Sequence, residues 1–393
     1  MKARSKRTKG STRRRAPVIP DCKHFTGYKP CFPSRDCLEE CVDPQKIGVK
    51  ILIVNLEAMG NVLVTTTLLA PIKRKYPVSS LYWITLKNTA HLLDHNPYLD
   101  RVYVWEPEAW LKLQSMRFDI VMNIDKSVHA CAFTMTLQAG KKLGYGLNGD
   151  GKIIPLNREA QHNYRLGLND FMKFRVNQKS NSQLLTEAMG LKYRRDEYVM
   201  PLSEEEQAFC RAYKSMNEMV AEDLIIGFNT GCSSAYPNKK MTVDQHVILI
   251  SELSKREGVR LVLLGGPEDT ERNAEIARRA GEKVLSTPTT EGLRRGICYE
   301  NICDVIITGD SLGMHIGIAL KKYIAVWFGV SCPPEVDLFD RGVKLIPEGL
   351  ACSPCWKREC PYDLECIQMV DLDGMVAAVE RLRFMPREGV EKV

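Results

Sequence analysis

The sequence predicts an α/β protein with two parallel-sheet domains that face each other across a cleft. Three observations predict this class. A buried-type strand, a polar turn and a helix follow one another near residue 55 and again near residue 309. Strand and helix patterns alternate along much of the chain, which is typical of parallel sheets covered by helices. The 393 residues are enough for two domains with separate cores.

The first strand–turn–helix unit opens the first domain. Residues 50–56 form a continuous apolar run that is typical of a buried strand, and the turn 57–61 follows. A helix is predicted over 62–76, because Pro77 ends it, and the next strand over 81–85. Ligands of such sheets bind at the carboxyl ends of the strands.

The remaining elements complete the first domain and build the second. Later strands of the first domain are predicted over 102–105, 118–124 and 143–145. The second domain is expected to contain strands 224–229, 259–264, 305–308 and 323–328, with helices 243–256, 271–280 and 313–320. A last amphipathic helix is predicted over 373–384.

These elements divide the chain into six parts. They are a basic tail (1–20), a cysteine-containing module (21–45), the first α/β domain (46–180), a polar helical connector (181–222), the second α/β domain (223–350) and a cysteine-rich loop with a final helix (351–393).

The net charge of +7 lies almost entirely in the first 15 residues, which carry eight lysines and arginines. Such a tail is typical of a disordered solubilising arm, and its charge also suits peripheral contact with an anionic membrane. No nucleic-acid-binding motif accompanies it, so no specific nucleic acid is expected. No apolar run approaches the ~20 residues that cross a bilayer, and no signal peptide is visible. We expect a cytoplasmic protein, with the inner face of the cytoplasmic membrane as a second location.

Eight of the 14 cysteines form two clusters. They are Cys22, Cys31, Cys37 and Cys41, and Cys352, Cys355, Cys360 and Cys366. Without a secretion signal, thiolate–metal sites gain weight over disulfides. The spacing C-x2-C-x4-C-x5-C of the second cluster favours structural zinc, with an iron–sulfur cluster as the alternative. Reduced cysteines without metal are a third interpretation, and the first cluster has a spacing less typical of metal sites.

Four features of the second domain follow strand ends and suit a nucleotide. They contain Thr230, Gly231 and Ser233; Lys239 and Lys240; Gly266 and Glu268; and Asp310 and Ser311. Hydroxyls, lysines and helix N-termini stabilise phosphate, glycine allows close backbone approach, and a carboxylate can accept from a ribose diol. Taken singly, each feature also fits a tight turn, a solvated lysine pair or a capped helix, with His315 in the core. Their recurrence in successive units favours a nucleotide site.

These residues resemble the ADP-heptose:lipopolysaccharide heptosyltransferases of glycosyltransferase family nine. The similar segments are 51–69, 86–104, 228–241, 263–268 and 308–329, and the resemblance covers about 46–385. The run Cys-Ser-Pro-Cys-x4-Cys-Pro at 352–361 also recurs in the family. The resemblance implies the glycosyltransferase B-type fold, in which two Rossmann-like domains bind the acceptor and the nucleotide sugar respectively. It also implies an inverting reaction that needs no metal or other cofactor for its chemistry.

The resemblance implies roles for individual residues. The diphosphate is expected to face Thr230, Gly231, Ser233 and Lys239. The ribose is expected at Glu268, and the sugar and phosphate at Asp310, Ser311, Gly313 and His315. The expected donor is an ADP-sugar, and the expected acceptor is a cell-envelope glycan or lipid, as in lipopolysaccharide biosynthesis.

Two departures from the family pattern concern the chemistry. Asn61 stands where the family usually has an aspartate that acts as general base, and an amide cannot accept the proton of an acceptor hydroxyl. Glu57 and Asp125, at strand ends of the same domain, are substitute bases by position. The glycine of the Asp-Ser-Gly-x-x-His order is moved by one, to Gly313. The leading hypothesis is an active glycosyltransferase, and the alternative is a catalytically impaired nucleotide-sugar-binding protein of the same fold.

Overall fold

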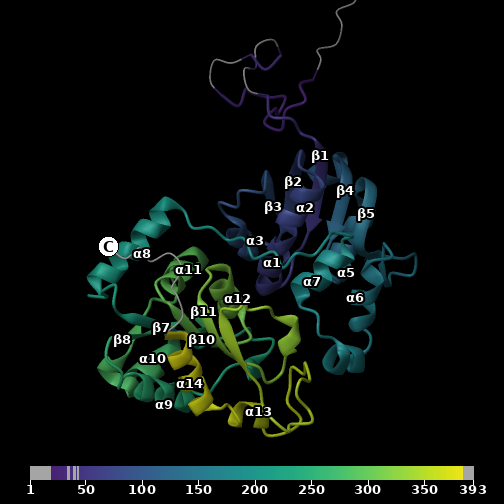
Figure 1. Ribbon diagram of the computed structural model, residues 1–393. Coiled ribbons are helices and arrows are strands. Elements are labelled where there is room, and N and C mark those ends of the chain that lie inside the picture. The colour runs from purple at the N-terminus through teal and green to yellow at the C-terminus, as the bar shows by residue number, and fades with distance from the viewer. Residues whose placement is uncertain (1–18, 33–35, 39–40, 42–43, 384–393) are drawn as a thin grey trace, which may run out of the picture.

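The computed structural model describes residues 19–32, 36–38, 41 and 44–383 (Figure 1). The basic tail predicted over 1–20 therefore lies outside the described residues up to residue 18. The described residues build two sheets, one in each predicted α/β domain, and each sheet is covered by helices.

The first domain contains a six-stranded sheet in its described residues, with the order β3-β2-β1-β4-β5-β6. The strands are β1 (Val49–Val54), β2 (Ser79–Thr85), β3 (Arg101–Val104), β4 (Arg117–Asn123), β5 (Gln138–Leu147) and β6 (Ile153–Pro155). All neighbours are parallel except β5 and β6. The helices are α1 (Met59–Thr65), α2 (Leu69–Lys75), α3 (Lys87–Ala90), α4 (Pro107–Ser115), α5 (Val128–Thr136), α6 (Ala160–Leu166) and α7 (Asn181–Ala188), with short turns η1 (Thr66–Leu68), η2 (His91–Leu93) and η3 (Met172–Val176).

The second domain repeats this topology. Its described strands follow the order β12-β11-β10-β7-β8-β9 and are all parallel. They are β7 (Leu224–Asn229), β8 (Val259–Leu264), β9 (Leu285–Ser286), β10 (Val305–Gly309), β11 (Tyr323–Trp327) and β12 (Gly342–Leu345). The helices are α8 (Glu204–Met216), α9 (Val243–Leu253), α10 (Thr270–Ala280), α11 (Leu293–Asn301), α12 (Leu312–Ala319), α13 (Glu365–Gln368) and α14 (Leu372–Arg383), with η4 (Pro237–Lys239), η5 (Pro267–Asp269), η6 (Gly281–Lys283) and η7 (Pro333–Glu335).

The helix predicted over 62–76 is broken into α1, η1 and α2. Pro71 lacks the N–H that would bond to the carbonyl of residue 67. The hydroxyls of Thr66 and Thr67 instead donate to the carbonyls of Leu63 and Val64 at 2.6 and 2.7 Å, and such bonds compete with regular helix geometry.

The predicted connector 181–222 is divided between the domains. Its first helix, α7, packs against α1 and α6 of the first domain, whereas α8 packs against α11 of the second. The final helix α14 returns to the second domain, where Met375 and Val379 join the core around β7. Figure 1 shows α8 and α14 on the second domain and α7 beside α1.

Candidate functional site

Both sheets reverse their strand order next to the first strand, and polar side chains gather at both places. In the first domain this switch point lies between β1 and β4, and in the second between β7 and β10. Helices on the two sides of a switch point diverge, so a crevice opens at the carboxyl ends of its strands.

Asn229, at the end of β7, ties the loops of the second switch point together. Its amide donates to Ser311 Oγ at 2.7 Å and to Thr308 Oγ1 at 3.0 Å. A Cβ on Gly313 would lie 2.4 Å from Asn229 Cγ, so only glycine lets α12 start this close. Ser311 is the N-cap residue of α12 but makes no capping hydrogen bond through its side chain, so the capped-helix alternative is not supported.

Asp310 pairs with Lys239 instead of capping the helix. Lys239 Nζ lies 2.8 Å from Asp310 Oδ2, and each side chain is only 12% exposed. Burial works to raise the pKa of the Asp310 carboxyl, but the positive charge of Lys239 and the His315 ring outweigh it, so this pKa lies below its ordinary value. The pair therefore places a cation and an anion together at the rim of the second sheet.

Trp356, from the cysteine-rich loop, covers this ion pair. Lys239 Nζ lies 4.3 Å from the centre of a Trp356 ring and 5.1 Å from that of Tyr236. Lys173, from the first domain, lies 4.8 Å from the same indole. Such contacts are cation–π interactions. Sequence reasoning missed Trp356, because no local signal links residue 356 to residue 239.

His315 lies where the two domains meet. Its Nδ1 is 3.2 Å from the Tyr198 hydroxyl, and its Nε2 is 3.9 Å from Asp310 Oδ1. Burial lowers the pKa of His315, and the negative charge of Asp310 offsets this only in part. A Cβ on Gly60 would lie 2.6 Å from His315 Cδ2, so this glycine lets α1 approach α12 closely.

Asp125 follows β4, the strand that corresponds in the first sheet to β10 of the second, so its position matches that of Asp310. Its Oδ1 accepts from the Asn55 amide at 2.8 Å, and its Oδ2 accepts from the backbone N–H groups of Leu56 and Glu57. Burial raises the pKa of Asp125 to about 6, and these donors offset part of the increase. Its two oxygens are thus engaged in holding the turn after β1.

The other two residues considered for proton transfer lie at the same turn and are exposed. Glu57 Oε1 is 3.4 Å from His129 Nε2, and the Glu57 side chain is 54% exposed. Asn61 is also exposed, in the first turns of α1. The structure therefore brings Glu57, Asn61 and Asp125 to the adjacent carboxyl ends of β1 and β4, near the contact between α1 and α12.

Asp269 contacts the loop after β7, which contains Gly231 and Ser233 and is predicted to face the diphosphate. This residue accepts from the Gly266 N–H at 3.0 Å, and a Cβ on Gly231 would lie 2.1 Å from its Oδ2. Gly231 and Gly266 are thereby brought together, whereas the buried Thr230 hydroxyl donates to Asn273 and is committed to the domain core. Ser233 and Glu268 are exposed. Their contacts with a nucleotide stay predictions.

Another ion pair, between Lys173 and Glu335, joins the two domains. Lys173 Nζ, on η3, lies 3.8 Å from Glu335 Oε1, on η7. Burial raises the pKa of Glu335, and Lys173 counteracts part of this effect. Burial lowers the pKa of the neighbouring Lys126 to about 8, and repulsion from Lys173 adds to this shift. No sequence motif indicated these residues, since they come from three distant segments.

The cysteines are free thiols, and no three metal-binding side chains among the described residues form a ligand group. The second cluster is nevertheless close enough for its members to influence one another. Burial raises the pKa of Cys366 to about 11, with further contributions from Cys355, Cys360 and Cys352. Metal binding at either cluster stays a prediction.

Comparison with known proteins identifies a family. A model of glycosyltransferase family 9 (heptosyltransferase) matches residues 108–365. A search of curated proteins gave no match.

Solved structures show the same fold. The glycosyl transferase family 9 protein of Veillonella parvula has a TM-score of 0.68 and 18% identity over 85% of this chain and 97% of that one. ADP-heptose LPS heptosyltransferase II of E. coli has a TM-score of 0.63 and 16% identity, over 85% of this chain and 98% of that one. The iron-containing dodecameric glycosyltransferase TibC of E. coli has a TM-score of 0.50 and 12% identity, over 86% of this chain and 76% of that one. The predicted fold with two Rossmann-like domains is confirmed.

Proposed function

We propose that this chain, which belongs to glycosyltransferase family 9 (heptosyltransferase) and is a glycosyltransferase that uses a nucleotide sugar, takes an ADP-sugar as its donor. A heptose is the first candidate for the sugar, and the proposed acceptor is a cell-envelope glycan or lipid. The structurally similar E. coli protein is an ADP-heptose LPS heptosyltransferase, which supports this choice.

The buried Lys239–Asp310 pair is the observation that carries the proposal. A departing nucleoside diphosphate develops negative charge, and a lysine beside a helix N-terminus can stabilise that charge without a divalent ion. Lys239 stands 2.8 Å from Asp310, just before the first turn of α12. In the proposed complex the diphosphate lies against Lys239 and the loop of Gly231 and Ser233. The sugar then faces Asp310 and His315.

The direct test is transfer of isotope-labelled heptose from ADP-heptose to a membrane glycolipid extract. We expect Lys239→Ala to lower kcat/KM by at least 100-fold, because one charged transition-state contact contributes about 3 kcal/mol. Lys240→Ala is the matched control and should change the rate less than threefold. Unchanged binding of all nucleotide sugars in the Lys239→Ala, Asp310→Ala double variant would refute the assignment.

We propose that the transfer inverts the anomeric centre and that Glu57 is the general base. Glu57 is exposed beside Asn61, so an acceptor hydroxyl can reach its carboxylate. Asp125 is the weaker candidate, since both its oxygens already accept hydrogen bonds. A Glu57→Gln variant should lose turnover while donor affinity, measured by calorimetry, stays the same.

The alternative is a catalytically impaired protein that binds nucleotide sugars, and Asn61 is the observation that favours it. In this case the natural chain would bind donor without turnover, and Asn61→Asp would raise transfer at least tenfold. Substantial turnover by the natural chain contradicts this alternative.

We also propose a structural metal at Cys352, Cys355, Cys360 and Cys366. Four thiolates suit zinc or an iron–sulfur cluster, and the structurally similar glycosyltransferase TibC contains iron, which adds support. The thiols influence one another's pKa but do not converge on a single point, so no catalytic step is assigned to a metal. Elemental analysis of purified protein tests this site, and the Cys355→Ser, Cys360→Ser double variant should lose the metal.

Among the described residues, no helix is long and apolar enough to span a membrane. We propose a cytoplasmic enzyme that contacts the inner face of the cytoplasmic membrane, where a lipid acceptor would be available. Flotation with anionic vesicles tests this contact, and deletion of residues 1–18 should weaken it.

A further inference from the structure

A cavity of about 450 Å³ lies beside α8, and none of the roles described above uses it. Its lining includes Cys210 of α8, together with Ala319, Leu320 and Lys321 at the end of α12. Asp310 precedes the start of α12, so the cavity lies at the opposite end of this helix from the nucleotide loops. The volume falls within the range of about 300–1,000 Å³ that is typical of small-molecule sites.

Cys210 contacts a second thiol. Its side chain shares a hydrogen bond with that of Cys298, on α11, and Asn301 Nδ2 lies 3.6 Å from Cys210 Sγ. The two helices pack against each other, and Figure 1 shows them side by side. Among the described residues, Cys210 is the thiol that lines the cavity, and Cys298 is only 1% exposed. A molecule in the cavity therefore meets Cys210 before Cys298.

The surroundings of Cys210 favour its thiolate. Hydrogen bonds from Cys298 and Asn301 and the charges of two nearby lysines lower the pKa of Cys210, although burial opposes them. The contact with Cys210 raises the pKa of Cys298, so Cys210 loses its proton first. Cys131 is also buried but lacks such neighbours, and burial raises its pKa to about 11. Because the thiolate is the form that attacks disulfides, Cys210 is the nucleophile of the pair.

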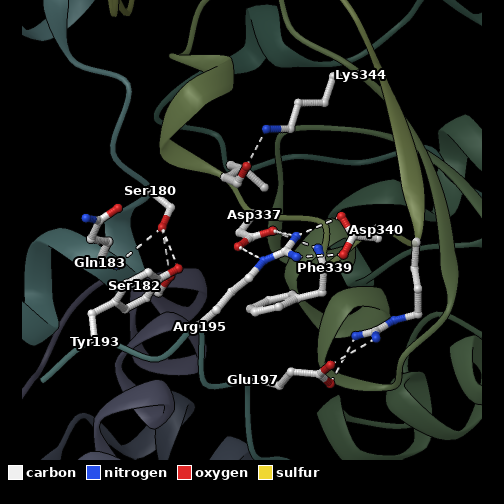
Figure 2. Close-up of polar contacts among 12 residues, drawn as sticks. Ser180, Ser182, Gln183, Tyr193, Arg195, Glu197, Asp337, Phe339, Asp340 and Lys344 are labelled. Carbon is white, nitrogen blue, oxygen red and sulfur yellow. Dashed lines mark hydrogen bonds and ion pairs between the residues drawn. The ribbon is translucent and has the colours of Figure 1, made fainter.

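Three cations line the cavity: Arg211, Lys214 and Lys321. In the part of the chain that the structure describes, only Lys321 of these three has an ion-pair partner, Glu197 at 3.9 Å. Figure 2 shows the Glu197 carboxylate, which accepts two shorter hydrogen bonds, both at 3.0 Å, from Arg341. The positive charge of the cavity is thus largely uncancelled, and it favours a ligand that carries carboxylates.

The carboxylates on the far side of the thiol pair have their own partners. Glu206, whose charge contributes to the raised pKa of Cys298, pairs with Arg294. Asp304 acts on the buried Lys322, which is not part of the described lining. Neither carboxylate therefore neutralises the cations of the cavity.

We propose that Cys210 is a modification site for small disulfides that carry carboxylates, and that Cys298 resolves the product. In the first step the Cys210 thiolate attacks one sulfur of R–S–S–R, where R bears a carboxylate. A Cys210–S–S–R bond forms, and R–S⁻ leaves and takes a proton from water. In the second step Cys298 gives its proton to water and attacks the Cys210 sulfur, and the second R–S⁻ leaves. Two protein thiols are oxidised to one disulfide, and R–S–S–R is reduced to two R–SH.

The first experiment treats the reduced full-length protein with oxidised glutathione, which is anionic, or with cystamine, which is cationic. Remaining thiols are alkylated, and peptides are identified by mass spectrometry. Each rate is divided by that of the same disulfide with N-acetylcysteine amide, a neutral thiol. We expect a disulfide between Cys210 and Cys298, formed at least tenfold faster with oxidised glutathione on this relative scale, and no modification of Cys131. Equal relative rates for the two reagents would overturn the proposal. So would an unmodified Cys210 in a sample in which the exposed Cys31 has reacted.

A charge reversal at the surface tests the cations without disturbing the core. Arg211 is exposed, so Arg211→Glu should fold. This change should slow the reaction of Cys210 with oxidised glutathione by roughly three- to tenfold and should not slow the reaction with cystamine. Lys283→Glu, an exposed change outside the cavity, is the matched control. Equal effects of the two variants would contradict the role of the cavity cations.

Serine variants test the order of the two steps. In Cys298→Ser the reaction should stop at the mixed disulfide on Cys210, whereas in Cys210→Ser the thiol of Cys298 should stay unmodified. Circular dichroism checks that both variants fold. Modification of Cys298 at the natural rate in Cys210→Ser, or of neither cysteine in folded Cys298→Ser, would overturn the proposed sequence.

Discussion

Replacing Lys239 by methionine should destabilise the protein in a pH-dependent way. At 2.8 Å and an effective dielectric constant of about 20, Coulomb's law gives an attraction of about 6 kcal/mol between Lys239 and Asp310. Desolvation of both groups cancels much of it. Removing one partner of a buried pair typically costs 3–5 kcal/mol, because the other charge stays buried and unpaired. We expect Lys239→Met to lower the free energy of unfolding by about 3 kcal/mol at pH 7.

The pH dependence follows from the pKa of Asp310. With Lys239 present, this pKa is depressed, so the pair stabilises the folded protein above the ordinary pKa of 3.8 and loses this effect as the pH falls. Without Lys239, burial raises the folded-state pKa above 3.8. The variant then gains stability as acid protonates Asp310, and the difference from the natural protein shrinks between pH 7 and pH 4.

Urea unfolding followed by tryptophan fluorescence at pH 7, 5.5 and 4 measures this difference. The control is Lys255→Met, which removes an exposed i,i+3 partner of Glu252 and should leave the free energy of unfolding nearly unchanged. Asp310→Asn combined with Lys239→Met should cost less than the sum of the single changes. Strict additivity, or a deficit that does not vary with pH, would refute the buried-pair reasoning.

Three further changes test other parts of the site. Gly60→Ala places a Cβ 2.6 Å from His315 Cδ2, so kcat/KM should fall at least tenfold while far-ultraviolet circular dichroism stays unchanged. Gly149→Ala, whose Cβ has nothing within 4 Å, is the matched control, and unchanged kinetics in Gly60→Ala would contradict the close contact. Asp125→Asn removes a group whose pKa rises from 3.8 to about 6 on folding, and such a group makes the natural protein lose stability as the pH rises from 4 to 6. The variant's unfolding midpoint should change less over this range, and an identical pH profile would argue against the raised pKa. Trp356→Ala removes the aromatic ring beside Lys239 and should weaken ADP binding three- to tenfold. Trp356→Phe keeps a ring and should bind ADP with nearly the affinity of the natural protein. An equal loss of ADP affinity in both variants would contradict this role of Trp356.

The fold was predictable because its buried strands appear in the sequence as short continuous runs of apolar residues. The apolar runs at 224–229 and 259–264 coincide with β7 and β8, since fully buried parallel strands need continuous apolar residues. The exact break between α1 and α2 was not predictable in the same way. It depends on how Pro71 and the threonine hydroxyls divide the helix hydrogen bonds.

The site was predictable only where its residues follow strand ends. Asp310 and Lys239 were identified in two separate loops, but their ion pair was not predicted. Two residues that are 71 positions apart leave no sequence pattern that would show their contact. Trp356 and the Lys173–Glu335 pair were missed for the same reason. Polar residues near a helix start also suggested caps at Asp310 and Ser311, and the competing partners Lys239 and Asn229 take both side chains.

The indole of Trp356 has a cation from each domain beside it: Lys239 at 4.3 Å and Lys173 at 4.8 Å. Nearby charges shift tryptophan emission, so separation of the domains would take one charge away and leave the other. We therefore expect the emission of Trp356 to change when the two domains move apart. A chain that retains this tryptophan alone could follow donor capture in real time without an attached dye.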